Sequence, residues 1–445
     1  MPDGARRRGT VGRIYGNLGR LLGGKAAAGL ISLAYIAVAT RALGPADYGV
    51  LVLVHGYAMV VGGLVAFPGW HAIVRYGAQA LSAGDNPRLA RLLRFAGLVE
   101  GGAGLLAVAM AAVLAPVLGP HLGWSPTAMA FAGFYSFAVL GSIRSTPAGY
   151  LQLAGRFDLI GAHNLVAPAV RLGGAAVAAA MHAGLRGFLI AWLVAALAEW
   201  AVMWALGVGV ARRRLEGTPL IGGLRGVVAE NPGLRRFMIA ANADITLGEL
   251  SGRLAPLAVG WVLGPASAGL YAVAQRATVV LSQPALVLGQ AAYAELARLV
   301  AEGGSGAALR KALRRSLGIA LAAAAPVTGL IAVFRTPIAV LIGGQGFAAA
   351  GGIMLWLACA RAVLVVAPPI GAALTALGRP GLSVTANLIS GLGLLIILPA
   401  MLAWFGLAGA GAHALLQALA AAGLLSWFVW RETETAAPRP VSAVG

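Results

Sequence analysis

Apolar residues recur along the whole chain in runs of about 20 residues, the length of a membrane-spanning helix, and short polar segments separate them. The pattern predicts an all-α, polytopic membrane protein with about twelve transmembrane helices, six in each half. Those of the first half are expected near residues 18–40, 48–66, 95–118, 127–143, 159–180 and 188–211. Those of the second half are expected near 237–263, 268–292, 317–334, 348–377, 382–404 and 407–429.

Composition excludes a soluble protein of this length. The chain has 445 residues, of which 60% are hydrophobic and only 11% are charged, whereas about a quarter of the residues of a soluble globule are charged. The single cysteine, Cys359, allows no intramolecular disulfide and no cysteine-based metal site. The six histidines have no metal-ligand spacing, and most lie near predicted helix ends, where interfacial roles are expected. No metal and no cofactor are therefore predicted.

Positive charge is distributed unevenly between the predicted loops. The chain carries 33 basic and 14 acidic residues, and 24 of the basic ones fall on one side of the twelve-helix arrangement. Only Arg41, Arg186 and Arg335 fall in loops on the other side. Because arginine and lysine are held on the cytoplasmic face, both termini of this multi-pass membrane protein are predicted to be cytoplasmic. The net charge of +19 then needs no nucleic-acid partner.

A short sequence repeats at half the chain length. Leu43–Gly49 and Leu263–Gly269 share five of seven residues at an offset of 220, and Gly-Pro punctuates both copies. An even number of helices separates the copies, which indicates two six-helix bundles in the same orientation. A chance match of apolar, glycine-rich sequence is the alternative.

The repeat sets the expected domain organisation. The N-terminal bundle would span residues 1–211, a basic cytoplasmic linker 212–236, the C-terminal bundle 237–430, and a cytoplasmic tail 431–445. Two such bundles are typical of a transporter that exposes a central site alternately to the two sides. A polar substrate site is therefore expected between them.

Two longer signatures carry a family resemblance. Thr40–Gly49 followed by Arg75–Gly77, and Gly264–Tyr271 with Tyr293–Leu296, resemble the signatures of Wzx-type polysaccharide and O-antigen flippases. These oligosaccharide flippases belong to the multidrug, oligosaccharidyl-lipid and polysaccharide exporter superfamily. The resemblance implies a MATE-like architecture without a bond-breaking step, and therefore a membrane transporter rather than an enzyme.

The resemblance also implies a substrate and partners. The substrate would be an undecaprenyl-pyrophosphate-linked oligosaccharide, moved from the cytoplasmic to the periplasmic leaflet during synthesis of a surface polysaccharide such as lipopolysaccharide O-antigen or exopolysaccharide. The lipid bilayer, a polysaccharide polymerase and assembly proteins would be its partners.

Ionisable residues inside the predicted spans are the candidate site residues, because each is costly unless it faces water or a partner. The cations are Arg20, Lys25, Arg171, Arg253, Arg276 and Arg361, and the acids are Glu100, Glu199, Asp244 and Glu249. An excess of buried positive charge suits a pyrophosphate, whose oxygens guanidinium groups bind through paired hydrogen bonds. Substrate binding is assigned to Lys25, Arg171, Arg253, Arg276 and, at the cytoplasmic entrance, Arg75.

Each assignment has a structural alternative. Arg253 follows Glu249 by four residues, the spacing of an ion pair within a helix. Arg276 and Arg361 would equally serve to neutralise Glu199 and Glu100. Arg75 would otherwise belong to a solvated basic loop that faces the membrane.

The acids of the seventh predicted helix, Asp244 and Glu249, suggest coupling of transport to protons or sodium, with structural pairing to Arg253 as the alternative. Two other functions compete with a flippase. A MATE-like cation or drug antiporter would need a net anionic cavity, and a membrane-embedded polysaccharide polymerase would need external carboxylates that the short outer loops lack.

Overall fold

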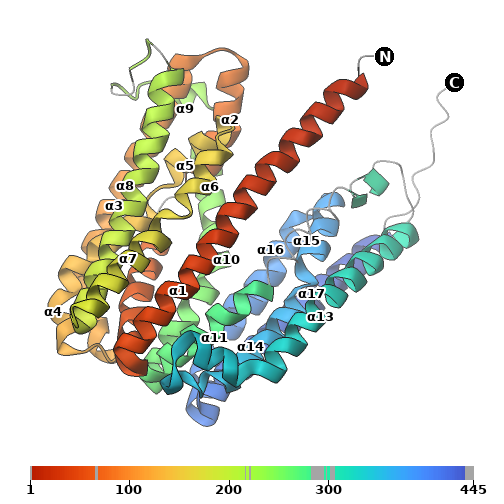
Figure 1. Cartoon of the computed structure of the whole chain (residues 1–445). Coiled ribbons are helices and arrows are strands. Elements are labelled where there is room, and N and C mark those ends of the chain that lie inside the picture. The colour runs from red at the N-terminus through yellow and green to blue at the C-terminus, as the bar shows by residue number, and fades with distance from the viewer. Residues whose placement is uncertain are drawn as a thin grey trace. The chain divides into compact units, whose positions relative to one another are not determined.

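The computed structural model describes residues 3–65, 69–215, 217–219, 222–281, 295–296, 298–300 and 306–435 (Figure 1). All regular elements in these residues are helices. Seven helical stretches among them are long and apolar enough to cross a membrane. The prediction of an all-α chain with multiple membrane-spanning helices is confirmed.

The chain divides into two compact units, Met1–Thr246 and Leu247–Gly445. The first unit contains α1 (Asp3–Val65), α2 (Trp70–Ser82), α3 (Asn86–His121), α4 (Pro126–Tyr135), the 3-10 helix η1 (Ser136–Ser142), α5 (Ser145–Leu153), α6 (Phe157–His163), α7 (Val166–Ala180), α8 (Gly184–Arg214) and α9 (Val227–Glu230). The boundary falls inside α10 (Leu234–Leu263).

The second unit continues with α11 (Pro265–Thr278), the 3-10 helix η2 (Val279–Leu281), α13 (Gly306–Gly343), η3 (Gln345–Phe347), α14 (Ala350–Leu364), α15 (Ala367–Ala376), α16 (Pro380–Leu388), the π-helical turn η4 (Ile389–Gly393) and α17 (Leu398–Thr435). Helix α13 continues to Gly343, beyond residue 334, where the sequence ends the ninth predicted helix.

The two copies of the repeat adopt the same backbone conformation. Gly44 has φ 68° and ψ 179°, and Gly264 has φ 82° and ψ 172°, a region open essentially to glycine alone. A proline follows each glycine and begins the next helix, where its missing N–H costs nothing. The sequence predicts outer loops at these positions, whereas the structure has one-residue breaks between consecutive helical segments.

The fourth predicted helix is longer than expected and is broken in the middle. The apolar span Pro126–Leu153 consists of α4, η1 and α5. Its backbone is irregular at Ile143 and Arg144, between η1 and α5. The sequence ends this helix at residue 143 and assigns Arg144 to a cytoplasmic loop. In the structure Arg144 is not in a loop but at the break between η1 and α5, which continues the apolar stretch to Leu153.

Side chains from neighbouring helices satisfy the backbone at this break. Glu100 of α3 is almost fully buried, and it accepts hydrogen bonds from the N–H groups of Ser145 and, at 2.7 Å, Thr146. The indole Nε1 of Trp204 in α8 donates to the carbonyl of Ile143 at 2.8 Å. Because no water reaches the hydrocarbon region, broken helices persist there only with such partners.

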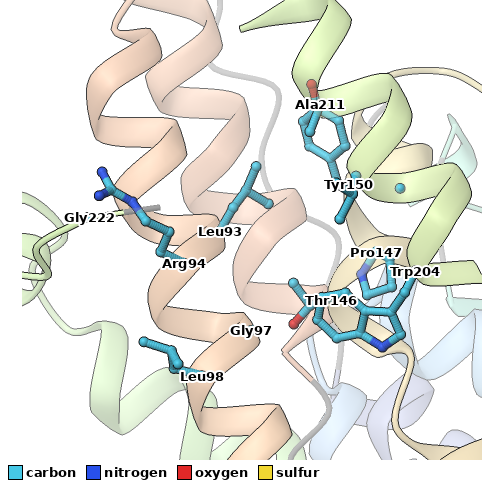
Figure 2. A pocket seen from close by; sticks show the side chains of 12 residues that line it. Leu93, Arg94, Gly97, Leu98, Thr146, Pro147, Tyr150, Trp204, Ala211 and Gly222 are labelled. Carbon is cyan, nitrogen blue, oxygen red and sulfur yellow. The ribbon is translucent and has the colours of Figure 1, made fainter. Parts of the chain in front are cut away.

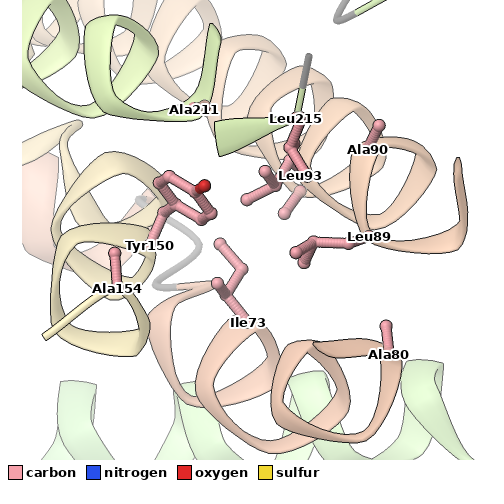
Figure 3. Close-up of a cluster of buried hydrophobic side chains, with 10 residues drawn as sticks. Ile73, Ala80, Leu89, Ala90, Leu93, Tyr150, Ala154, Ala211 and Leu215 are labelled. Atoms are coloured by element: carbon pink, nitrogen blue, oxygen red, sulfur yellow. The ribbon is translucent and has the colours of Figure 1, made fainter. Parts of the chain in front are cut away.

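Each unit has its own apolar core. In the first, Ile73 of α2, Leu89 and Leu93 of α3, and Tyr150 of α5 pack together beside the end of α8 (Figure 3). In the second, Leu309, Ile370 and Leu425 belong to a cluster that joins α13, α15 and α17.

Candidate functional site

Arg171 of α7 lies among polar and aromatic side chains inside the first unit. Its Nη1 donates to the hydroxyl of Tyr35 at 3.3 Å, and its Nη2 donates to Nε2 of His55 at 3.0 Å. The guanidinium carbon lies 5.8 Å from the ring centre of Tyr35 and 5.6 Å from that of Trp192, both within cation–π range. Nδ1 of His55 is in turn 2.9 Å from the hydroxyl of Tyr135. We call these five residues the Arg171 cluster.

The hydrogen bonds fix the protonation of His55. Arginine only donates, so Nε2 of His55 accepts and carries no proton. The remaining proton of the neutral ring lies on Nδ1, which therefore donates to the oxygen of Tyr135. All the partners of Arg171 in this cluster are thus uncharged.

Four elements build the Arg171 cluster. Helix α1 contributes Tyr35 before the Gly44 break and His55 after it, so the break lets one element line two sides of the cluster. Tyr135 is the last residue of α4, and Trp192 belongs to α8. Tyr35 and Trp192 pack edge to face, with ring centres 5.2 Å apart. The packing of these aromatic rings holds the donors and acceptors around Arg171.

Arg171 makes no ion pair among the described residues. The nearby acid, Glu199 of α8, is in a salt bridge with Arg144 instead. Nε of Arg171 is buried and has no hydrogen-bond partner in the described part of the chain, although the side chain as a whole is only half-buried. A guanidinium with an unused N–H donor and no ion pair is able to bind an anion through hydrogen bonds.

Arg171 is the one predicted binding residue that the structure surrounds with a polar cluster inside the described part of the first unit. Lys25 is exposed on α1, next to Gly24, and a Cβ at position 24 would lie 2.5 Å from the carbonyl oxygen of Gly161. In the second unit, Arg253 is half-buried in α10, and Arg276 is half-buried in the last turn of α11.

The predicted ion-coupling residues are on α10. The side chains of Asp244 and Glu249 lie outside the described residues. The alternative interpretation paired Glu100 and Glu199 with Arg276 and Arg361. In the structure these acids have other partners. Glu100 caps α5, Glu199 pairs with Arg144, and Nε of Arg361 donates to the hydroxyl of Thr278 at 3.1 Å.

The basic stretch from Arg75 to Arg94 holds the linker rather than lying free in solvent. Arg88 donates twice to the side-chain oxygen of Asn231, at 3.1 and 3.0 Å, and Arg91 forms a 2.7 Å salt bridge with Glu230. The exposed guanidinium of Arg75 lies 4.7 Å from the ring centre of Phe237. These contacts fix α9 and the start of α10 to α2 and α3.

An exposed ion pair joins Arg156 and Asp158 at the start of α6. Arg156 donates from Nη2 to the carboxylate of Asp158 at 2.8 Å. This hydrogen bonding, with the positive charge of Arg156, lowers the pKa of Asp158 below its usual value.

Histidines are the functional candidates that the sequence interpretation missed. The sequence interpretation gave His55 no role in a binding site, yet it bonds Arg171 inside the first unit. His163 and His413 each bond a main-chain carbonyl at 2.8 Å, of Glu199 and Leu394 respectively. The position of His55 in the middle of a predicted span was the signal available. No group of three His, Cys, Asp or Glu side chains in the described residues would hold a metal ion.

Comparison with known protein families matches residues 38–350 to a family described as polysaccharide biosynthesis protein. The chain belongs to this family. A curated relative, the inner membrane protein YghQ of Escherichia coli strain K12, is 28% identical over 270 residues, which cover 61% of this chain and 76% of the relative. Together with the apolar spans, this likeness supports a multi-pass inner membrane protein.

Solved structures show the fold of this family member to be that of membrane transporters. The lipid II flippase MurJ in an inward closed conformation matches with a TM-score of 0.69 at 12% identity, over 93% of this chain and 89% of MurJ. An inward-facing multidrug resistance transporter of the MATE family matches with a TM-score of 0.66 at 14% identity, over 93% of this chain and 96% of that one. The predicted MATE-like architecture is therefore confirmed.

Proposed function

We propose that this protein is a flippase that moves an undecaprenyl-pyrophosphate-linked oligosaccharide from the cytoplasmic to the periplasmic leaflet by alternating access between its two units. Membership of the polysaccharide biosynthesis family and the fold shared with a lipid II flippase support this proposal. The observation that carries it is the Arg171 cluster, in which a guanidinium inside the membrane has only neutral partners.

The chemistry of the cluster suits a phosphate group. Arginine presents its donors as a planar fork that matches two phosphate oxygens, and these charge-assisted hydrogen bonds are stronger than bonds to neutral acceptors. The bonds from Arg171 to Tyr35 and His55 are therefore replaceable by stronger ones when the pyrophosphate arrives. Tyr35 and His55 keep the guanidinium oriented before binding, which lowers the cost of ordering it at that moment.

The other predicted residues extend the path in this proposal. Arg75 would meet the pyrophosphate at the cytoplasmic entrance, and Lys25, Arg253 and Arg276 would bind it during passage. Asp244 and Glu249 would couple transport to a proton or sodium ion. A polysaccharide polymerase and assembly proteins would receive the product.

A cation or drug antiporter is the alternative for this fold. Such a transporter needs a carboxylate available to its cationic substrate. Two acids of the long apolar helices α3 and α8 are already occupied, Glu100 by the N-terminus of α5 and Glu199 by Arg144. The charge arrangement of this unit therefore favours an anionic substrate.

The test is the leaflet distribution of undecaprenyl-linked oligosaccharides in a strain that lacks this protein and has no second flippase. Wild-type protein should relieve their accumulation on the cytoplasmic leaflet, Arg171→Gln should not, and the exposed control Arg186→Gln should act as wild type. An unchanged distribution in the strain that lacks the protein would contradict the proposal and favour the cation or drug antiporter instead.

A further inference from the structure

A cavity of about 310 Å³ lies between α3, α5 and α8, away from the Arg171 cluster. Its walls are mainly apolar, and Leu93, Leu98, Pro147, Trp204 and Val208 are among the residues that form them. Figure 2 shows the leucines of α3 on one side of the cavity, with Pro147 and Trp204 on the other. The volume lies at the small end of ligand pockets, which suits part of a hydrocarbon chain rather than a whole lipid.

The cavity is continuous with the surface that faces lipid. Leu98 is 62% exposed, and Leu105, two turns further along the same face of α3, is 71% exposed. In a membrane-spanning helix such exposed leucines meet hydrocarbon. One wall of the cavity is therefore part of the lipid-facing surface, so a chain can enter sideways from the bilayer.

Arg94 provides a positive charge at the rim. It belongs to α3, one turn before Leu98, and its Nε donates to the carbonyl of Ala90 at 3.3 Å. Its two terminal nitrogens have no hydrogen-bond partner in the described part of the chain. Nη1 lies against the linker at Gly222, where a Cβ would collide with it, and Nη2 does not come within 4 Å of that position (Figure 2). The donors of Arg94 are thus available to an anion at the mouth of an apolar cavity.

The surroundings place this rim at headgroup level. The last turn of α8 carries three exposed arginines, Arg212, Arg213 and Arg214, at the end of the helix where the cavity lies. Such basic helix ends meet the anionic lipids of the cytoplasmic leaflet.

The cavity is separate from the Arg171 cluster. Along α8, Trp204 of the cavity is twelve residues beyond Trp192 of the cluster, which corresponds to about 18 Å of helix. No step of the proposed translocation uses the cavity.

We propose that this cavity binds one acyl chain of an anionic phospholipid from the cytoplasmic leaflet, with the lipid phosphate held by Arg94. A single guanidinium with two available nitrogens matches the single negative charge of a phosphodiester. The same arginine would leave most of the charge of a pyrophosphate unpaired, so the phospholipid is favoured over the polyprenyl substrate.

Native mass spectrometry of the full-length protein, released from nanodiscs of defined composition, tests this site. The nanodiscs contain phosphatidylglycerol and phosphatidylcholine with identical chains at equal mole fraction, and a second set adds undecaprenyl phosphate. Arg94→Gln removes the charge, and its matched control is Arg213→Gln, an exposed arginine of α8. Val208→Trp fills the cavity, and its matched control is Val113→Trp on the exposed face of α3.

Wild type and both controls should retain one phosphatidylglycerol several-fold more often than phosphatidylcholine. Arg94→Gln should abolish this preference, and Val208→Trp should abolish retention of either lipid. Retention by Arg94→Gln equal to wild type, equal retention of the two phospholipids by wild type, or displacement of phosphatidylglycerol by undecaprenyl phosphate at equal mole fraction would each overturn the proposal. These outcomes are independent of whether the protein moves an oligosaccharide.

Discussion

Two arginines inside the first unit have opposite electrostatic surroundings. Arg144 lies at the break between η1 and α5 and forms a salt bridge with Glu199, whereas Arg171 is hydrogen-bonded to the neutral side chains of Tyr35 and His55 and contacts aromatic faces. Arg144 lies within the apolar stretch Pro126–Leu153 and Arg171 lies on α7 inside the same unit, where a charge is costly without a partner.

The difference separates stability from recognition. The carboxylate that neutralises Arg144 also makes Arg144 unavailable to any other anion, so this arginine contributes to the fold. Arg171 retains unused hydrogen-bonding capacity, which a substrate anion can take up. Residues of the first kind should affect the amount of folded protein, and residues of the second kind should affect transport.

The largest expected effect is that of Arg171→Gln on transport. Loss of two charge-assisted hydrogen bonds to phosphate, each worth about 1.5–3 kcal/mol, predicts a fall in translocation of at least about a hundredfold. The amount of folded protein in the membrane should remain near wild type. The substitution leaves behind only the neutral side chains of Tyr35 and His55, so it creates no unpaired charge. Leaflet-resolved lipid analysis, combined with size-exclusion chromatography, measures both. Equal losses of folded protein and transport would contradict the distinction between an arginine that stabilises the fold and one that binds the substrate.

His55→Glu should give Arg171 a carboxylate partner, as Glu199 is for Arg144. A carboxylate at position 55, within reach of Nη2, would pair with the guanidinium and compete with the substrate. Translocation should fall by at least about tenfold, as for removal of one charge-assisted bond, while the fold persists. His55→Gln, which keeps a neutral acceptor, is the matched control and should retain most of the activity. Comparable activity of the Glu and Gln variants would argue against an anionic substrate at this position.

Arg144→Gln should act on stability instead. It leaves Glu199 unpaired inside the unit, and the salt bridge is partly exposed, with side-chain exposures of 33% and 20%. The expected loss is therefore about 1–3 kcal/mol, between the values for surface and buried pairs. Thermal unfolding in detergent measures it. The double variant Arg144→Gln with Glu199→Gln should lose less than the two single variants combined, and additive losses would show that the pair is not coupled.

The smallest expected effect concerns the linker. Tyr76→Phe removes a 3.1 Å hydrogen bond from the tyrosine hydroxyl to the carbonyl of Pro232, at a cost of about 0.5–1.5 kcal/mol. Limited proteolysis should cut the linker faster in this variant while transport by the Arg171 cluster persists. Unchanged cleavage rates would mean that the contacts of Arg88 and Arg91 hold the linker without Tyr76.

The positions of the helices follow from the sequence because apolar length alone determines them. Arg171 was also predictable, since a charge in an apolar run is visible without coordinates. Its partners were not, because Tyr35 and His55 lie 136 and 116 residues away in the chain.

Arg144 shows where sequence reasoning fails. The break at Ile143 and Arg144 has the appearance of a helix end, and its stabilisation comes from Glu100 and Trp204 on other helices. The partners of these two side chains at the break are main-chain groups, the N–H groups of Ser145 and Thr146 and the carbonyl of Ile143, which carry no sequence signal. A broken span and a loop therefore have the same local pattern.

The central claim is that Arg171 binds the pyrophosphate of the substrate. Isothermal titration calorimetry of the purified protein with a short-chain polyprenyl pyrophosphate tests it directly, with Arg171→Gln beside the exposed control Arg186→Gln. The account predicts binding to wild type and to the control, and affinity at least about tenfold weaker for Arg171→Gln. Equal affinity of Arg171→Gln and wild type would contradict it.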